Sequence, residues 1–273
     1  CGICESCRLM DIENNSFAHP DFYLLTAEEA GKDIKIEQVK EMAKQAAFAP
    51  VLSEHKVCII DDAGQMTAEA ANSLLKLLEE PPPGWLFILI TQQAERLLPT
   101  VLSRVVRLRF DAPDSSAVQQ ILKAKGITQN TQVLAALAGG SPGRALSYNQ
   151  ADIFAIRRET LDLLKKLPLQ NPFGYIAALG WGEKYDRAAA LLLTEQFIYL
   201  LRDVLLLQSG ARGQVYNTDI MAGLDGIAAD WPLHTARQGV NAAQEAWQNI
   251  NKNVSAKNVL EALVLKLDLL RKE

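Results

Sequence analysis

Three short runs of apolar residues, rich in valine, isoleucine and leucine, stand out in the first part of the chain. They cover residues 57–60, 85–91 and 105–110, and the first is followed at once by Asp61 and Asp62. Short apolar runs bounded by charges, glycine or proline are typical of strands that are buried on both faces of a parallel sheet. We therefore predict a strand in each of these runs.

Helical periodicity separates the runs. Apolar residues recur at helical spacing in 34–48 and again in 68–80, where Thr67 suits the N-cap position. The prolines and the glycine at 81–84 end the second helix, because proline cannot continue it. With a further strand at 21–26, the order of elements predicts a parallel α/β sheet with right-handed crossovers.

After residue 111 the strand patterns stop and only helical patterns remain. Short helices come first and predict a small three-helix lid over 112–150. Longer helices follow and predict an all-α domain over 151–273, so the fold class is α/β plus all-α. The predicted helices cover 117–126, 131–138, 143–149, 153–167, 172–180, 185–207, 233–249 and 255–270.

Composition narrows the classes of function. The chain has 273 residues, 49% of them hydrophobic, which is enough for two or more cores. It contains no run of about 18 uncharged apolar residues, so we expect no membrane span. A net charge of −4 excludes a chain built as a whole around the nucleic-acid backbone. Because the chain begins with cysteine, not methionine, we expect it to be a piece of a longer protein.

Three cysteines at the start predict a metal site. Cys1, Cys4 and Cys7 have C-x₂-C-x₂-C spacing, which suits thiolates converging on one ion better than disulfides. A structural zinc ion takes four ligands, so one more is needed. His19 is a candidate, whereas Cys58 lies inside a predicted strand. We favour zinc over an iron–sulfur or redox role, in a reducing, cytoplasmic compartment.

Four segments carry a family resemblance: IIDDA at 59–63, AANSLLKLLEEPP at 70–82, FILIT at 87–91 and LLPTVLSR at 97–104. Their succession resembles the AAA+ clamp-loader subunits of bacterial DNA polymerase III, the delta-prime type most of all. The resemblance covers about residues 1–150 well and the remainder weakly.

The resemblance implies a domain organisation. Residues 21–111 would form the later part of an AAA+ parallel-sheet core, into which a zinc module at 1–20 is inserted. The lid at 112–150 and a helical collar at 151–273 would complete the chain. The resemblance also implies that the fourth zinc ligand is a cysteine upstream of Cys1.

The resemblance marks a weakened nucleotide site. Asp61 matches the position that holds Mg²⁺, Asp62 stands where active relatives carry glutamate, and Thr91 lies where the γ-phosphate is sensed. A carboxylate one methylene shorter withdraws the base by about 1 Å, enough to slow the chemistry. The second sensor arginine is replaced by Gly143, with Arg144 displaced by one residue. No G-x₄-G-K-[ST] occurs in these residues, so we do not expect ATP to bind in the usual way.

Ser103 and Arg104 match the serine–arginine motif of the family, although Val105 replaces its cysteine. The resemblance implies that Arg104 acts in trans, as an arginine finger on ATP bound by a neighbouring subunit. A guanidinium is always charged and offers a planar set of donors to phosphate oxygens. The alternative is that Arg104 caps a helix or pairs with a nearby acid.

The resemblance implies a clamp-loader subunit that does not hydrolyse ATP itself. Its partners would be the gamma/tau and delta subunits in a hetero-oligomeric ring, and through the ring the sliding clamp and primer–template DNA. Two other hypotheses remain: an active clamp-loader ATPase of gamma/tau type, and a zinc-dependent DNA-binding protein. Few basic residues surround Cys1–Cys7, which disfavours the last.

Overall fold

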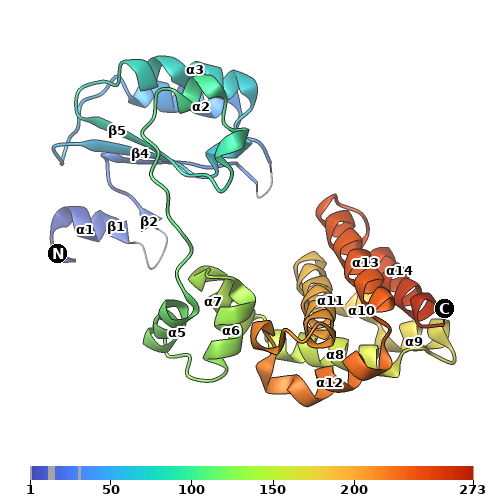
Figure 1. Ribbon diagram of the computed structural model, residues 1–273. Helices are drawn as coiled ribbons and strands as arrows, with labels where there is room; N and C mark the ends of the chain where they lie inside the picture. The colour runs from blue at the N-terminus through green and yellow to red at the C-terminus, as the bar shows by residue number, and fades with distance from the viewer. Residues whose placement is uncertain (1, 12–15, 30–31, 273) are drawn as a thin grey trace. The chain divides into compact units, whose positions relative to one another are not determined.

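A computed structural model describes residues 2–11, 16–29 and 32–272 and divides the chain into two compact units, Cys1–Arg109 and Phe110–Glu273 (Figure 1). Each unit has its own hydrophobic core. Cys1 lies outside the described residues.

The first unit is built on a parallel sheet of β3 (Phe22–Leu25), β4 (Lys56–Ile60) and β5 (Trp85–Leu89), in the order β3-β4-β5. The register aligns Leu25 with Ile60 and Ile60 with Leu89, so the three strands end side by side. The predicted parallel α/β sheet is therefore confirmed.

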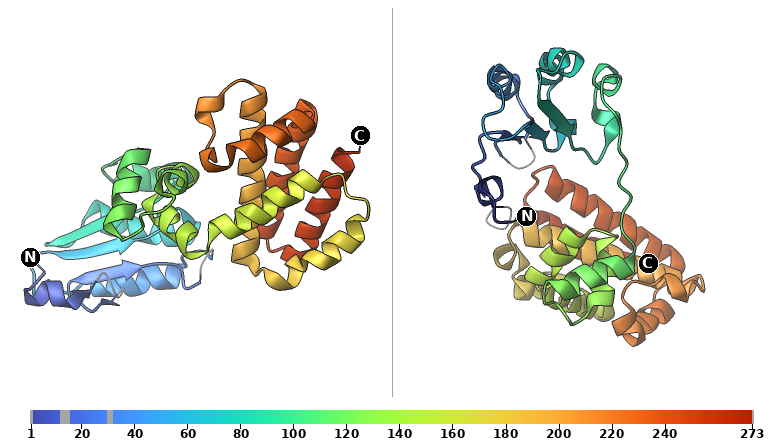
Figure 2. Two further views of the ribbon diagram at one scale, coloured as in Figure 1. Left: turned by 90° about the horizontal axis from the view of Figure 1, so that it is seen from below. Right: turned by 90° about the vertical axis from the view of Figure 1, so that its left-hand side faces the viewer.

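Two helices, α2 (Ile36–Gln45) and α3 (Ala68–Glu79), cover the same face of this sheet (Figures 1 and 2). Cys58 and Ile60 of β4 are fully buried against them. Thr67 caps α3 as predicted, because its side-chain oxygen accepts the backbone N–H of Ala70 at 3.2 Å. The smaller elements are α1 (Glu5–Leu9), β1 (Met10–Asp11), β2 (Ser16–Phe17), η1 (Ala63–Gln65), η2 (Ala94–Arg96) and α4 (Pro99–Leu102).

Two predictions about the strands are wrong. The strands are not buried on both faces, since Leu86 and Ile88 of β5 are 50% and 38% exposed. Residues 105–110 form no strand, and the side chains of Val106, Leu108 and Phe110 are exposed. Helices α2 and α3 cover only one face of the sheet, which leaves side chains on the other face exposed. Residues 105–110 pair with none of the described strands, so no ladder holds them extended as a strand.

The second unit is helical throughout its described residues, as predicted. The elements that the sequence did not predict are short or rich in glycine, as in α12, where Gly223 and Gly226 lower the helical propensity. The elements are α5 (Ser115–Ala124), α6 (Thr131–Ala138), α7 (Pro142–Gln150), α8 (Ile153–Lys166), α9 (Pro172–Leu179), α10 (Trp181–Lys184), α11 (Arg187–Gln208), η3 (Arg212–Gln214), η4 (Thr218–Ile220), α12 (Met221–Asp230), α13 (Leu233–Asn251) and α14 (Ala256–Leu270).

One hydrophobic core runs through all of these α-helices, so the division into a lid and a collar stays a prediction. The apolar helix α11 packs closely on α13, where a Cβ at Gly239 would lie 3.0 Å from Leu201 Cδ1. Within residues 2–11, 16–29 and 32–272, we find no helix with the length and apolar character needed to cross a bilayer.

The buried carboxylate of Asp21 fixes the amino end of the sheet. Its oxygens accept three successive backbone N–H groups, from Val51, Leu52 and Ser53, each at 2.7 Å. Burial alone raises the pKa of Asp21, but the three backbone N–H groups outweigh it, so the pKa is lowered. The ionised carboxylate therefore stabilises the fold above its unfolded pKa, and this contribution is lost as the pH falls through the folded pKa.

We predict that Asp21→Asn destabilises the first unit by about 2–3 kcal/mol at pH 7, because an amide cannot accept all three N–H groups. The loss should shrink in acid, below the lowered pKa of Asp21, where the wild-type carboxylate itself becomes protonated. Urea denaturation at pH 7 and in acid measures it, with Asp33→Asn at an exposed site as the control. Equal effects of Asp21→Asn and Asp33→Asn at pH 7 would contradict the account.

Candidate functional site

Two adjacent carboxylates, Asp61 and Asp62, lie at the carboxyl edge of the sheet, directly after β4. Backbone hydrogen bonds continue the ladder past the strands, from Asp61 N to Leu25 O at 2.9 Å and from Ala63 N to Ile90 O at 2.8 Å. The two aspartates are therefore held between the ends of β3 and β5, where α/β sheets bind ligands.

The conformation of Asp62 sets the direction of both side chains. Its backbone is left-handed, with φ 49° and ψ 49°, and its amide donates to Asp61 Oδ1 at 3.0 Å. The Asp62 carboxylate in turn accepts a hydrogen bond from the side chain of Gln65. Both carboxylates are exposed, and each already accepts one hydrogen bond from a neighbour in the chain.

Thr91 lies at the same edge, just after β5. Its hydroxyl closes a turn with Gln93, accepting the backbone N–H at 3.2 Å and donating to the carbonyl at 3.2 Å. A Cβ at Gly64 would lie 3.0 Å from Thr91 Oγ1, so Thr91 packs against the loop that follows Asp62. The structure thus brings Asp61, Asp62 and Thr91 to one edge, and their role in nucleotide binding stays a prediction.

Arg104 follows α4 and is held by several acceptors. Its Nε donates to Glu79 Oε1 at 2.7 Å, and its Nη2 also binds Glu79 in an ion pair. Its Nη1 donates to the carbonyl of Thr100 at 2.8 Å and to Ser103 Oγ at 3.0 Å. Arg104 is therefore paired with an acid, which is the alternative that the sequence left open.

Helix α3 separates Arg104 from the acidic edge. The helix begins at Ala68, six residues after Asp62, and returns along the sheet, and Glu79 is its last residue. Twelve helical residues span about 18 Å. Arg104, docked on Glu79, accordingly lies at the far end of α3 from Asp61 and Asp62, too far for its side chain to reach them.

Arg144 does not project freely from the second unit. Its Nη2 lies 2.9 Å from Glu195 Oε1 and donates to Tyr199 Oη at 3.0 Å, both on α11. Tyr148, one turn further along α7, donates to the other oxygen of Glu195 at 2.9 Å. These bonds tie α7 to α11, which gives Arg144 a structural role.

The cysteine segment is described only from residue 2 onward. Cys4 occupies the N-cap position of α1 without a capping hydrogen bond from its side chain, and Cys7 lies on the first turn of the helix. The pKa of the Cys7 thiol is lowered, most by a hydrogen bond with the Cys4 side chain and next by the backbone of Gly2. Burial raises the pKa of Cys58 to about 12, which makes it a poor metal ligand.

His19 is buried in the first unit, and both of its ring nitrogens contact residues of that unit. Its Nδ1 accepts the backbone N–H of Asp21 at 3.0 Å, and its Nε2 lies 3.4 Å from Ser53 Oγ. Among the described residues, which leave out Cys1, no group of three or more His, Cys, Asp or Glu side chains is placed to hold a metal ion. His19 is therefore not grouped with Cys4 and Cys7.

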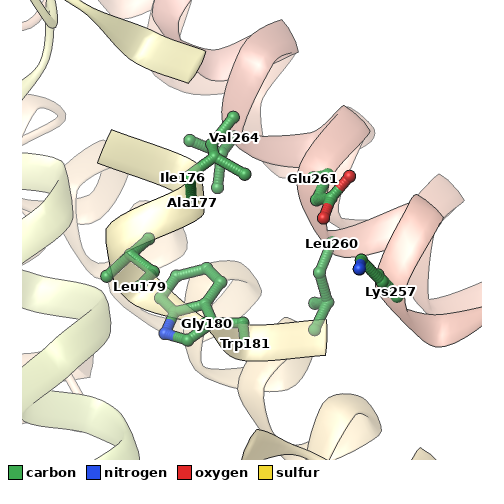
Figure 3. Close-up of a pocket in the computed structure, with 9 residues that line it drawn as sticks. All are labelled: Ile176, Ala177, Leu179, Gly180, Trp181, Lys257, Leu260, Glu261 and Val264. Atoms are coloured by element: carbon green, nitrogen blue, oxygen red, sulfur yellow. The ribbon is translucent and has the colours of Figure 1, made fainter. Parts of the chain in front are cut away.

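A cavity of about 260 Å³ lies in the second unit between α14 and the turn from α9 to α10 (Figure 3). Most of its lining residues are apolar, and α14 adds two charged side chains, Lys257 and Glu261. It contains none of the predicted site residues. The lining residues are Ile176, Ala177, Leu179, Gly180, Trp181, Lys257, Leu260, Glu261 and Val264.

Comparison with known proteins identifies the family. The family model described as DNA polymerase III, delta subunit, matches residues 1–114. The delta' subunit of DNA polymerase III from Escherichia coli is 34% identical over 247 residues, covering 89% of this chain and 69% of that protein. The chain belongs to the DNA polymerase III delta' family.

One further relative and one solved structure are also similar to this chain. The Bacillus subtilis delta' subunit is 29% identical over 268 residues, covering 97% of this chain and 80% of its own length. The structure of a gamma subunit-related protein from Thermotoga maritima matches with a TM-score of 0.51 at 19% identity, covering 92% of this chain and 84% of that one. At that identity the likeness supports the fold alone.

In this delta' family member, sequence reasoning missed the partners of Arg104. Glu79 lies in the LLKLLEEPP segment, but only the structure pairs it with Arg104, 25 residues further on. The carbonyl of Thr100 leaves no signal in the sequence at all. Predicting a pair of this kind requires knowing that α3 and α4 lie side by side.

We predict that Arg144→Ala destabilises the second unit by about 1–2 kcal/mol, because it removes an ion pair and a hydrogen bond between α7 and α11. Thermal unfolding measures the loss, and Arg158→Ala on the exposed side of α8 is the control. If Arg144→Ala were no more destabilising than Arg158→Ala, the structural role would be wrong.

Proposed function

We propose that this chain is a clamp-loader subunit of DNA polymerase III that does not hydrolyse ATP and supplies Arg104 to a neighbouring subunit's ATP. The observation that carries the proposal is the position of Arg104 at the end of α3 remote from Asp61 and Asp62. An arginine placed there cannot assist a nucleotide at its own acidic edge, but it is available to a nucleotide on another chain.

The chemistry of the group supports this role. A guanidinium stays charged at any physiological pH and binds phosphate oxygens through pairs of parallel N–H groups. Charge that develops on a transferring phosphoryl group is stabilised by such a group, with Ser103 beside it in this chain. Arg104 is 32% exposed in its side chain, so a partner's phosphate can approach it.

The residues at the acidic edge of this chain's own sheet are poorly suited to hydrolyse ATP, which agrees with a subunit that does not do so. Asp61, Asp62 and Thr91 are vestigial nucleotide-site positions in this proposal. At the position of the catalytic base, Asp62 has a shorter side chain than glutamate, and its carboxylate accepts a hydrogen bond from Gln65. Arg144 is committed to Glu195 and Tyr199, so it is not available to sense a phosphate.

The partners follow from the same proposal. The chain would sit in a hetero-oligomeric ring with gamma/tau and delta subunits, which loads the sliding clamp on primer–template DNA. The helical second unit would serve as lid (112–150) and collar (151–273), and the first unit as the AAA+ core. Family membership supports the assignment to DNA polymerase III.

We further propose a structural zinc site at Cys1, Cys4 and Cys7. The donor chemistry fits, because Cys4 and Cys7 lie one helical turn apart, their thiols are hydrogen-bonded, and the pKa of Cys7 is lowered toward the thiolate that zinc binds. Zinc would fix the short segment that contains α1. The fourth ligand of such a site is not among the described residues.

An active ATPase of gamma/tau type is the second candidate, because the chain shares its fold with a gamma subunit-related protein. It requires that the full-length protein alone hydrolyse ATP. Our proposal predicts that it does not.

We predict that Arg104→Ala in an otherwise wild-type reconstituted loader lowers clamp- and DNA-stimulated ATP hydrolysis by an order of magnitude or more. Arginine fingers supplied in trans raise kcat by roughly 10³–10⁵-fold in GTPases, so a ten-fold loss is a lower bound for the expected effect. The ring should still assemble, which size-exclusion chromatography verifies. Arg107→Ala is a matched control, and equal hydrolysis by both variants would refute the finger.

We predict that the full-length protein holds about one zinc ion per chain and that Cys4→Ser with Cys7→Ser releases it. Elemental analysis of the purified protein measures the content. Cys58→Ser should keep the metal, since that thiol is buried in β4. Zinc retained by the double variant would exclude these cysteines as ligands.

A further inference from the structure

Glu79 is the acidic residue that the LLKLLEEPP segment presents to Arg104, and the proposed function gives it no role. It is the last residue of α3, and both Nε and Nη2 of Arg104 bind its Oε1. The pairing joins α3 to the turn after α4. Glu79 is 47% exposed in its side chain, so this pair lies at the surface of the first unit.

Counting the donors of Arg104 indicates which edge of its guanidinium can take a phosphate. A guanidinium has five N–H groups. Glu79 takes one from Nε and one from Nη2, which together form one edge of the planar group. Nη1 gives its two to Thr100 O and Ser103 Oγ. The fifth N–H, the second one on Nη2, has no acceptor in these contacts. It points away from the Arg104 side chain, along the outer edge of the guanidinium that Nη1 and Nη2 form together.

A phosphate oxygen can replace Ser103 Oγ as the acceptor of an Nη1 N–H without disturbing the Arg104–Glu79 pair. Ser103 Oγ is a hydroxyl that rotates, and it also donates to Thr100 O at 3.0 Å, so it keeps a partner when Arg104 releases it. A phosphate can then take one N–H from Nη1 and one from Nη2. Glu79 remains on the Nε edge throughout, and the guanidinium does not need to turn.

We propose that Glu79 is a positioning residue for Arg104: it holds the Nε edge so that the Nη1–Nη2 edge is presented to a neighbouring subunit's triphosphate. The inference rests on the proposed function of Arg104. Glu79 does not touch the phosphate itself. Its effect is to replace the many rotamers of a long side chain by one orientation, and orientation of reacting groups controls rate strongly.

The test measures clamp- and DNA-stimulated ATP hydrolysis by the reconstituted full-length loader with Glu79→Ala, Glu79→Gln and Arg104→Ala in this chain. Glu79→Ala should lower kcat by about ten-fold or more and leave the KM for ATP unchanged, since the misplaced guanidinium acts on the chemical step. Glu79→Gln should recover most of the rate, because its amide oxygen still accepts from Nε and Nη2. Glu80→Ala is the matched control, as it removes the adjacent charge and leaves the Glu79 pair intact.

A double variant separates positioning from a general effect on the fold. Glu79→Ala should add no further loss to Arg104→Ala, because both act through the same guanidinium. The role of Glu79 would be overturned if Glu79→Ala lowered the hydrolysis rate equally in the wild-type and Arg104→Ala loaders. It would also be overturned if Glu79→Ala alone did not lower the rate. If Arg104→Ala slows hydrolysis and Glu79→Ala does not, only the positioning role fails; if Arg104→Ala has no effect, the proposed function fails with it.

Discussion

The in-register ladder of β3, β4 and β5 is the constraint on which the arrangement of the first unit depends. Because the strands are parallel, their carboxyl ends meet at one edge, and the residues that follow them are brought together. Each crossover helix must return to the other edge before the next strand begins. The ladder therefore places Asp61 at one end of α3 and Glu79 at the other.

This separation divides the charged groups between two edges of the unit. The acidic edge keeps its carboxylates in local hydrogen bonds, and the far end of α3 keeps Arg104 against Glu79. The side chains of that pair are 32% and 47% exposed, and ion pairs as exposed as this stabilise a fold by about 1 kcal/mol or less. Such a pair orients a guanidinium without competing strongly with the denser charge of a triphosphate.

Local features of the sequence predicted much of the fold. The β-branched run before Asp61, the N-cap at Thr67 and the helical spacing of α3 each act over a few residues, and each has the predicted structure. Residues 105–110 failed because an alternating apolar segment becomes a strand only beside a partner, which no local pattern reveals. The Arg104–Glu79 pair was missed for the same reason, since it depends on how two helices pack.

We propose above all that Arg104 acts on a nucleotide bound by another subunit while Glu79 holds the guanidinium in place. A structure of the assembled loader with a phosphoryl-transfer transition-state mimic in the neighbouring site tests this directly. We expect Nη1 and Nη2 of Arg104 to lie within hydrogen-bonding distance of the mimic, and Glu79 to remain bound at Nε. Arg104 turned away from every neighbouring nucleotide would contradict this proposal.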